Sequence, residues 1–184
     1  MTLPEQITRW AADQGLTHQQ GTAGTAVFSP DLVHRYALTR TWAPGPHRVY
    51  VLLNPSTATA DQDDPTVRRL VGFAQRDRFG GLVLANLFAL RSTDPGILTT
   101  GLLDTVGAHN DGLLQLLAET AHDLTVGWGA WGRLQRVATV EKALTAHRVR
   151  LWALGTTKAG HPRHPLYLPA AAPLQPYQPG GVAR

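Results

Sequence analysis

The chain contains no cysteine among its 184 residues. Without cysteine it forms no disulfide, has no thiolate nucleophile and offers no thiolate ligand to zinc. It also lacks an apolar run long enough to cross a bilayer. Its opening, MTLPEQITRW, has no basic segment followed by an apolar one, as a secretory signal requires. We therefore expect a cytoplasmic protein that makes no membrane contact.

Charged residues are also scarce, at 16%, while 43% of the residues are hydrophobic. These values are typical of a globular protein and exclude an intrinsically disordered chain. Lysine is nearly absent: fifteen of the 17 basic side chains are arginine, and the formal net charge is +4. Arginine binds phosphate with a planar fork, so this excess is compatible with a polyanionic partner. It fits an ordinary arginine-rich surface equally well.

Along the chain, apolar runs typical of β-strands alternate with segments whose apolar residues have the spacing of an α-helix. Apolar runs typical of buried strands occupy 48–53, 82–86, 123–129 and 148–155. Helical patterns separate them at 64–77, 110–122 and 131–147, and a further short helix is expected within 4–20. Two shorter segments within 22–42 have side chains that alternate between two faces, as in the strands of an antiparallel hairpin.

Strands that alternate with helices predict an α/β fold. We expect a three-layer α/β/α domain over 1–170, with a mainly parallel four-stranded sheet in 48–169 and a small N-terminal hairpin at 22–42. The proline- and glycine-rich tail, 171–184, is expected to pack loosely. Because loops that leave the carboxyl ends of parallel strands share one edge, four polar loops should meet there.

The first of these loops is NPSTATADQDDPT. Pro55 fixes the backbone between Asn54 and Ser56, and Thr57 follows as a further candidate substrate contact. The loop also carries three aspartates. Asp61 and Asp63 are candidates to orient or deprotonate a water, to hold a metal, or simply to be solvated, whereas Asp64 is expected to cap the next helix.

The next two loops offer amide, cationic and aromatic groups. Asn86 ends an apolar strand, where its amide either reads the edge of a nucleobase or ties down nearby backbone. Arg91 is a candidate phosphate contact, with a salt bridge to Asp94 as the alternative. In GWGAWG, Trp128 and Trp131 either stack on a base or belong to the core.

The fourth loop reads GHPRHPLYLP and is stiffened by three prolines. His161 and His164, with Lys158 and Arg163, form a cationic group. One of these histidines would donate to a negative charge that develops on a leaving group. Two alternatives are zinc ligation and capping of backbone carbonyls. We predict that Asn54, Asn86, Trp128 and one of the two histidines line one pocket.

Several long motifs carry a resemblance to a known family. The segments LNPSTATADQDDPTVRR, GLVLANLFALRSTDP, VGAHND, WGAWG and LGTTKAGHPRHPLYLP resemble an uncharacterised bacterial domain-of-unknown-function family. The order LNPST, LANLF, VGWGAWG and GHPRHPLY is also similar, more distantly, to that of the uracil-DNA glycosylase superfamily. That similarity implies a fold of the same kind.

The distant resemblance also implies roles. Asn54 or an aspartate of 61–64 would handle water, Asn86 would read the base, and His161 or His164, as a cation, would stabilise the departing base. Asn110 and Asp111, in VGAHND, lie outside the shared motifs and are candidate contacts to a different substrate. The expected activity is hydrolysis of an N-glycosidic bond in nucleic acid or a nucleotide, with no metal and no cofactor.

Two other functions stay open. A non-catalytic module would bind a nucleotide or nucleic acid through the same loops, and a metal-dependent hydrolase would use the aspartates and histidines. The sequence leaves the oligomeric state open, with a monomer as the simplest expectation.

Overall fold

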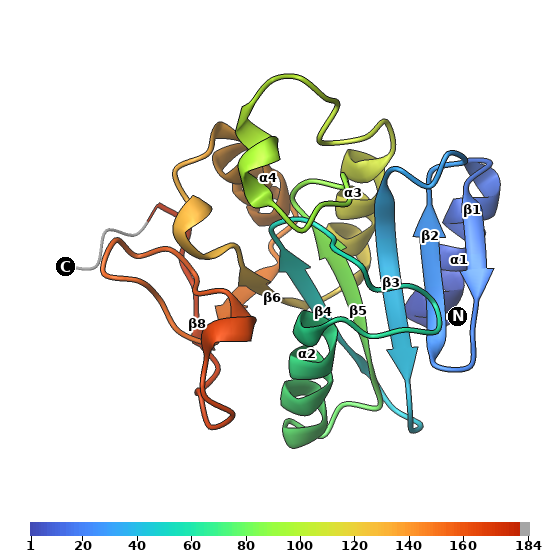
Figure 1. The fold of residues 1–184 in the computed structure, drawn as a ribbon. Coiled ribbons are helices and arrows are strands. Elements are labelled where there is room, and N and C mark those ends of the chain that lie inside the picture. The colour runs from blue at the N-terminus through green and yellow to red at the C-terminus, as the bar shows by residue number, and fades with distance from the viewer. Residues whose placement is uncertain (181–184) are drawn as a thin grey trace.

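The computed structural model describes residues 1–180. Within them lies a single eight-stranded mixed sheet in the order β1-β2-β3-β5-β4-β6-β7-β8 (Figure 1). Its strands are β1 (Thr17–Gln20), β2 (Gly24–Phe28), β3 (Arg35–Thr41), β4 (His47–Leu52), β5 (Gly81–Asn86), β6 (Asp123–Gly127), β7 (Arg150–Ala153) and β8 (Gln175–Pro176). The helices are α1 (Leu3–Asp13), α2 (Pro65–Arg76), α3 (Asn110–Thr120) and α4 (Gln135–Ala146), with short 3-10 turns η1 (Pro95–Thr99), η2 (Gly129–Trp131) and η3 (Pro165–Tyr167).

The sheet is covered on both faces because its central strands alternate two apolar sets of side chains. On β4, Val49 and Val51 join the larger core cluster with α1, α3 and α4. Tyr50 and Leu52 point the other way and pack with Val67 and other residues of α2. Full burial of such a side chain contributes roughly 1.5–3 kcal/mol. The α/β class is thus confirmed, with three helices on one face and α2 on the other (Figure 1).

The pairing of the strands changes along the sheet. The pairs β4–β5, β4–β6 and β6–β7 are parallel, and all other neighbours are antiparallel. The expected hairpin at 22–42 is not a separate appendage, because β3 pairs with β5 and extends the main sheet. The sheet is therefore larger and more mixed than the sequence predicts.

The short helix expected within 4–20 is present as α1 and occupies only the first part of that range. Helix α1 begins at the capping box of Thr2 and Glu5 and stops before Gly15, which has a left-handed φ of 65°. The next residues, THQQ, form β1 at the edge of the sheet. An edge strand needs no apolar alternation, so this polar tetrapeptide gives no strand signal.

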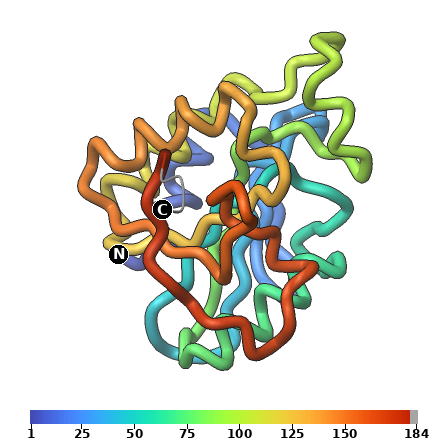
Figure 2. The backbone as a smooth tube through the Cα atoms, turned by 90° about the vertical axis from the view of Figure 1, so that its left-hand side faces the viewer, coloured from blue at the N-terminus to red at the C-terminus, as the bar shows by residue number. Residues whose placement is uncertain are grey.

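The C-terminal segment is packed more firmly than expected over its described part, 171–180. Strand β8 pairs antiparallel with β7. Tyr177 is buried, and its hydroxyl donates to Glu141 of α4. Figure 2 shows this segment along the side of the molecule that faces the viewer. The remainder of the predicted tail, 181–184, lies outside the described residues.

None of the helices in 1–180 has the length and apolar character to cross a bilayer.

Candidate functional site

The parallel part of the sheet contains a point where chain connections leave in opposite directions. Strand β4 leads to α2 on one face, whereas its neighbour β6 leads to α4 on the other. Such a divergence opens a crevice outside the carboxyl ends of the two strands, which is where open α/β sheets bind ligands.

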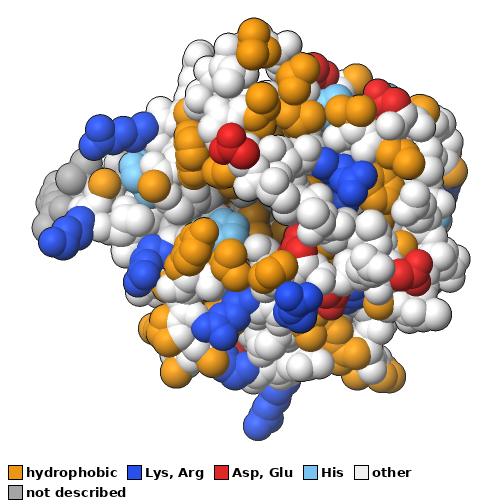
Figure 3. Space-filling view, in the orientation of Figure 1, with side chains coloured by type: hydrophobic (Ala, Val, Ile, Leu, Met, Phe, Trp, Pro, Cys, Tyr) orange, Lys and Arg blue, Asp and Glu red, His pale blue; other side chains and the backbone are white. Residues whose placement is uncertain are grey.

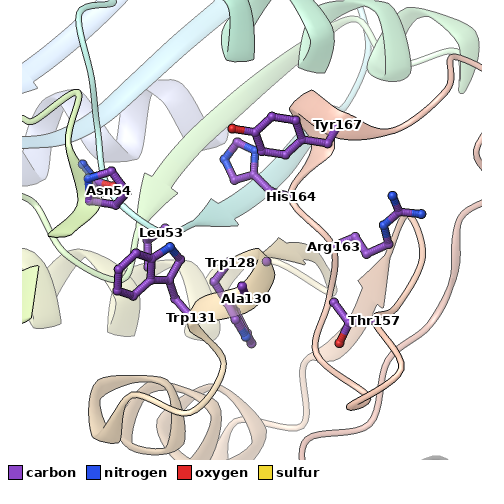
Figure 4. Close-up of a pocket in the computed structure, with 11 residues that line it drawn as sticks. Leu53, Asn54, Trp128, Ala130, Trp131, Thr157, Arg163, His164 and Tyr167 are labelled. Carbon is purple, nitrogen blue, oxygen red and sulfur yellow. The ribbon is translucent and has the colours of Figure 1, made fainter.

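A pocket of about 350 Å³ occupies this crevice, at the lower end of the range for small-molecule sites. We call it the edge pocket. The space-filling view shows a hollow on this face, bordered by hydrophobic and histidine side chains (Figure 3). Its lining comes from the loops after β4, β5, β6 and β7: Leu53, Asn54, Pro95, Trp128, Gly129, Ala130, Trp131, Thr157, Arg163, His164 and Tyr167 (Figure 4).

The glycines of VGWGAWG let the histidine loop approach β6 closely. A side chain at Gly127 would collide with the ring of Pro165, and one at Gly132 would collide with the imidazole of His161. Between them, Gly129 takes a left-handed φ of 65° and donates its N–H to the carbonyl of Pro162 at 2.8 Å. These glycines serve loop docking, which in turn fixes the histidines.

The two histidines of this loop are held differently. His164 lines the edge pocket, with its ring beside Tyr167 (Figure 4). His161 is not part of the lining; its ring packs against Gly132 and lies near Glu141. The structure therefore selects His164 as the candidate functional histidine, a choice that the sequence leaves open.

His164 is a neutral hydrogen-bond donor in this setting. Its Nδ1 accepts from the backbone N–H of Leu166 at 3.3 Å, so the proton of the neutral ring lies on Nε2. Burial lowers the pKa of His164 below its usual value, and the nearby carboxylate of Asp64 raises it by a smaller amount. The cation expected from the sequence is thus disfavoured, and an Nε2–H donor remains.

Asn54 supplies an acceptor to the same pocket. Its Nδ2 donates to the carbonyls of Ser92 at 2.9 Å and Pro55 at 3.0 Å. Because these two bonds occupy the amide nitrogen, the orientation of the amide is fixed and Oδ1 remains available to accept. A half-buried amide oxygen of this kind is suited to holding a water or a substrate N–H.

The two tryptophans of GWGAWG are placed differently. Trp128 is fully buried and contacts Tyr177 edge to face, with ring centroids 5.9 Å apart. Its indole belongs to the core even though the residue borders the pocket. Trp131 is half-buried and lines the same pocket (Figure 4). Tyr167 is 76% exposed beside His164 and provides a second aromatic face.

The aspartates of the first loop turn away from the edge pocket and serve the fold. Asp63 forms a salt bridge with the buried Arg40, at 2.8 Å, and Asp61 accepts the backbone N–H of Thr22 at 2.9 Å. Asp64 accepts the N–H of Val67 at 2.8 Å and caps α2, as predicted. Neither Asp61 nor Asp63 belongs to the pocket lining, so the structure does not bring them to the candidate chemistry.

The two candidate asparagines, Asn86 and Asn110, are both buried, and each has a side-chain Oδ1 without a hydrogen-bond partner among the described residues. Asn110 is fully buried, and its Nδ2 donates to the carbonyls of Asn86 and Leu87. Asn86 is buried at the end of β5 and is not in the pocket lining, contrary to the spatial prediction. Asp111 forms an ion pair with Arg136 beside a groove between α3 and α4.

The remaining candidates divide between two places. Arg163 is exposed at the rim of the edge pocket, and Lys158 is exposed on the same loop without being part of the lining. Ser56, Thr57 and Arg91 line a separate hollow across the 54–57 loop. The alternative salt bridge from Arg91 to Asp94 does not form.

Nowhere in 1–180 do three histidine, aspartate or glutamate side chains gather as a metal would require.

Pro95, Thr157 and Tyr167 are among the pocket residues that carry no sequence prediction of their own. Tyr167 and Thr157 belong to the histidine loop, so the spacing HPLY was an available signal for the first of them. Pro95 comes from η1, and nothing local marks it, because its position depends on how the loop after β5 folds back.

Comparison with known proteins gives one family. The family model described as protein of unknown function (DUF1643) matches residues 35–166. No curated protein and no solved structure matches the chain.

Proposed function

The chain belongs to the DUF1643 family of proteins of unknown function, and we propose that it hydrolyses an N-glycosidic bond in nucleic acid or a nucleotide. One observation carries the proposal: a neutral Nε2–H donor on His164 and a fixed amide acceptor on Asn54 line the same pocket, flanked by the aromatic ring of Trp131. A base needs a flat wall to stack on, and a departing base needs a hydrogen-bond donor.

In the proposed reaction the bond between the sugar C1′ and the base nitrogen breaks, and the base keeps the electron pair. His164 Nε2–H donates to the developing negative charge on the base, as donors aimed at a leaving anion do. Asn54 Oδ1 accepts from a water that attacks the oxocarbenium carbon, and that water releases its proton to solvent. A neutral donor needs no proton transfer, which suits a base that leaves as an anion.

The motif order shared with the uracil-DNA glycosylase superfamily supports the same proposal and extends it to a fold of that kind. LNPST and GHPRHPLY hold the places of the water loop and the leaving-group loop in that order. In this chain each of those two motifs contributes to the lining of the edge pocket, and Asn54 and His164 are the members that supply the acceptor and the donor.

A base-release assay tests the proposal. Single- and double-stranded oligonucleotides that carry uracil, hypoxanthine, xanthine or oxidised pyrimidines are incubated with the protein, and alkaline cleavage reveals abasic sites. His164→Phe removes the donor and should lower the rate by about 10²–10³-fold, the usual cost of one such donor. His161→Ala is the matched control and should retain activity, because His161 lies outside the pocket.

Release that is equal in both histidine variants would overturn the role of His164, and no release from any lesion would overturn the hydrolase. A chelator arm addresses the metal-dependent alternative, since loss of release on chelation would favour that mechanism instead.

A further inference from the structure

The hollow across the 54–57 loop from the edge pocket has a different chemical character. It measures about 380 Å³ and is wide open. Its lining is rich in hydroxyls and contains one guanidinium: Leu32, Val33, Ser56, Thr57, Arg91, Ser92 and Thr93. We call it the hydroxyl hollow. The hydroxyls of Ser56, Thr57 and Thr93 make no hydrogen bond within 1–180, so they are available to a ligand.

The guanidinium of Arg91 is held in place but not neutralised. It lies 5.2 Å above the ring of Phe28, and its Nη1 donates to the carbonyl of Leu32 at 3.1 Å. Its Nε is buried without an acceptor. Among the described residues no carboxylate lies within salt-bridge distance of this arginine. A positioned arginine without a counter-ion is suited to an anion.

A second arginine increases the positive charge beneath the loop. Arg35 is fully buried, and within 1–180 the only hydrogen bond of its side chain runs from Nη1 to the carbonyl of Ala58. Burial lowers the pKa of Arg35 to about 10; Asp64 raises it, and the neighbouring charges of Arg91 and Arg40 lower it further. Arg35 therefore remains a cation at neutral pH.

The carboxylates around the hollow are engaged with other donors. Asp31 accepts from the hydroxyl of Ser29 and the N–H of Val33, and Asp94 accepts the N–H of Gly96. Below the loop, Asp63 pairs with Arg40 and Asp64 caps α2. Arg35 and Arg40 thus lie below the loop with Asp63 and Asp64, two positive and two negative charges, and Arg91 carries the positive charge of the hollow itself.

We propose that the hydroxyl hollow binds a phosphate group through Arg91 and the surrounding hydroxyls, with Arg35 adding positive charge from below. The hollow and the edge pocket share a wall, because Asn54 donates to the carbonyl of Ser92 and Ser92 donates its N–H to Pro55. A phosphate held here would belong to the same ligand as a base in the edge pocket. That last step rests on the proposed function; the phosphate site itself does not.

Binding of undamaged ligands tests the site without any base release. Fluorescence anisotropy of a labelled single-stranded oligonucleotide is measured over a range of salt concentrations for the wild type and for Arg91→Gln. We expect about tenfold weaker binding by the variant and a salt slope smaller by about one, as for a lost phosphate contact. Arg9→Gln, which removes an exposed charge from α1, is the matched control and should change neither value.

Competition identifies the source of the phosphate. A nucleoside 5′-monophosphate that competes where the nucleoside does not indicates a monoester, whereas competition by oligonucleotides alone indicates a phosphodiester; both outcomes support a phosphate site. Thr57→Glu places a negative charge on the exposed rim and should also weaken binding. Because Thr57 is exposed, this second variant tests the same site even if Arg91→Gln fails to fold.

Equal affinity and salt slope in the wild type and Arg91→Gln would overturn the phosphate site, as would no binding of any phosphate-bearing probe. Arginine-dependent binding without base release would contradict the hydrolase and keep the phosphate site. Base release together with equal binding by the wild type and Arg91→Gln would support the hydrolase and contradict the phosphate site.

Discussion

The Nδ1 atom of His164 accepts the backbone N–H of Leu166 two residues further along the chain, at 3.3 Å. The bond orients the ring and determines which nitrogen carries the proton. It forms because Pro165 begins the short turn η3, with His164 as its N-cap. A proline-stiffened loop therefore presents one defined donor, Nε2–H, to the edge pocket.

The first prediction concerns the protonation of His164. Burial lowers its pKa, so its NMR titration midpoint should lie below the ordinary value of about 6.5, with the neutral ring protonated at Nε2. Because the unfolded state then binds protons more readily, the free energy of unfolding should rise with pH between the folded pKa and about 6.5. The assigned signal is the one that disappears in His164→Gln. A midpoint above 6.5 would contradict the neutral donor.

The second prediction separates the two aspartates of the first loop. Asp63→Ala leaves the buried guanidinium of Arg40 without its carboxylate and should lower the free energy of unfolding by about 2–3 kcal/mol. Asp61→Ala removes a single acceptor at an exposed position and should cost about 1 kcal/mol. Urea denaturation measures both. If base release survives in the folded variants, the aspartates act through stability; a selective loss of release in either would restore a chemical role.

The third prediction concerns the attachment of the C-terminal segment. Tyr177→Phe removes the hydroxyl that donates to Glu141, whose carboxyl is buried on α4. Burial already raises the pKa of Glu141, and loss of the hydroxyl should raise it further. The free energy of unfolding should fall by about 1–3 kcal/mol. Tyr167→Phe, at an exposed ring with no such bond, is the control. Equal stability of the two variants would show that the contact with Glu141 contributes nothing.

The sheet could be predicted where burial dominates. RVYVLL and GLVLAN are apolar on both faces because they lie at the centre of the sheet, and they form β4 and β5. THQQ could not be predicted, because an edge strand is defined by its partner β2 and its own side chains are polar. The union of the hairpin with the sheet likewise depends on β3 pairing with β5, a contact between distant segments.

For the candidate site, the sequence predicts which loops meet but not which of their side chains enter the pocket. The carboxyl-edge rule brings Asn54 and His164 to one pocket. What separates His164 from His161 is the fit of the latter against Gly132, a tertiary contact with no local signature. The aspartates near Asn54 have the composition of a catalytic cluster, yet Arg40 holds Asp63 in a salt bridge from β3.

The last prediction concerns the aromatic wall of the edge pocket. Trp131 is half-buried and lines the cavity, whereas Trp128 is enclosed in the core. Stacking of a base on an aromatic ring contributes about 1–3 kcal/mol, so Trp131→Ala should weaken the binding of base-containing ligands by that amount. Calorimetric titration of the wild type and the variant with a nucleoside measures the difference. Trp10→Ala, on α1 and outside the lining, controls for the general loss of an aromatic ring. Unchanged affinity in Trp131→Ala would place the base elsewhere.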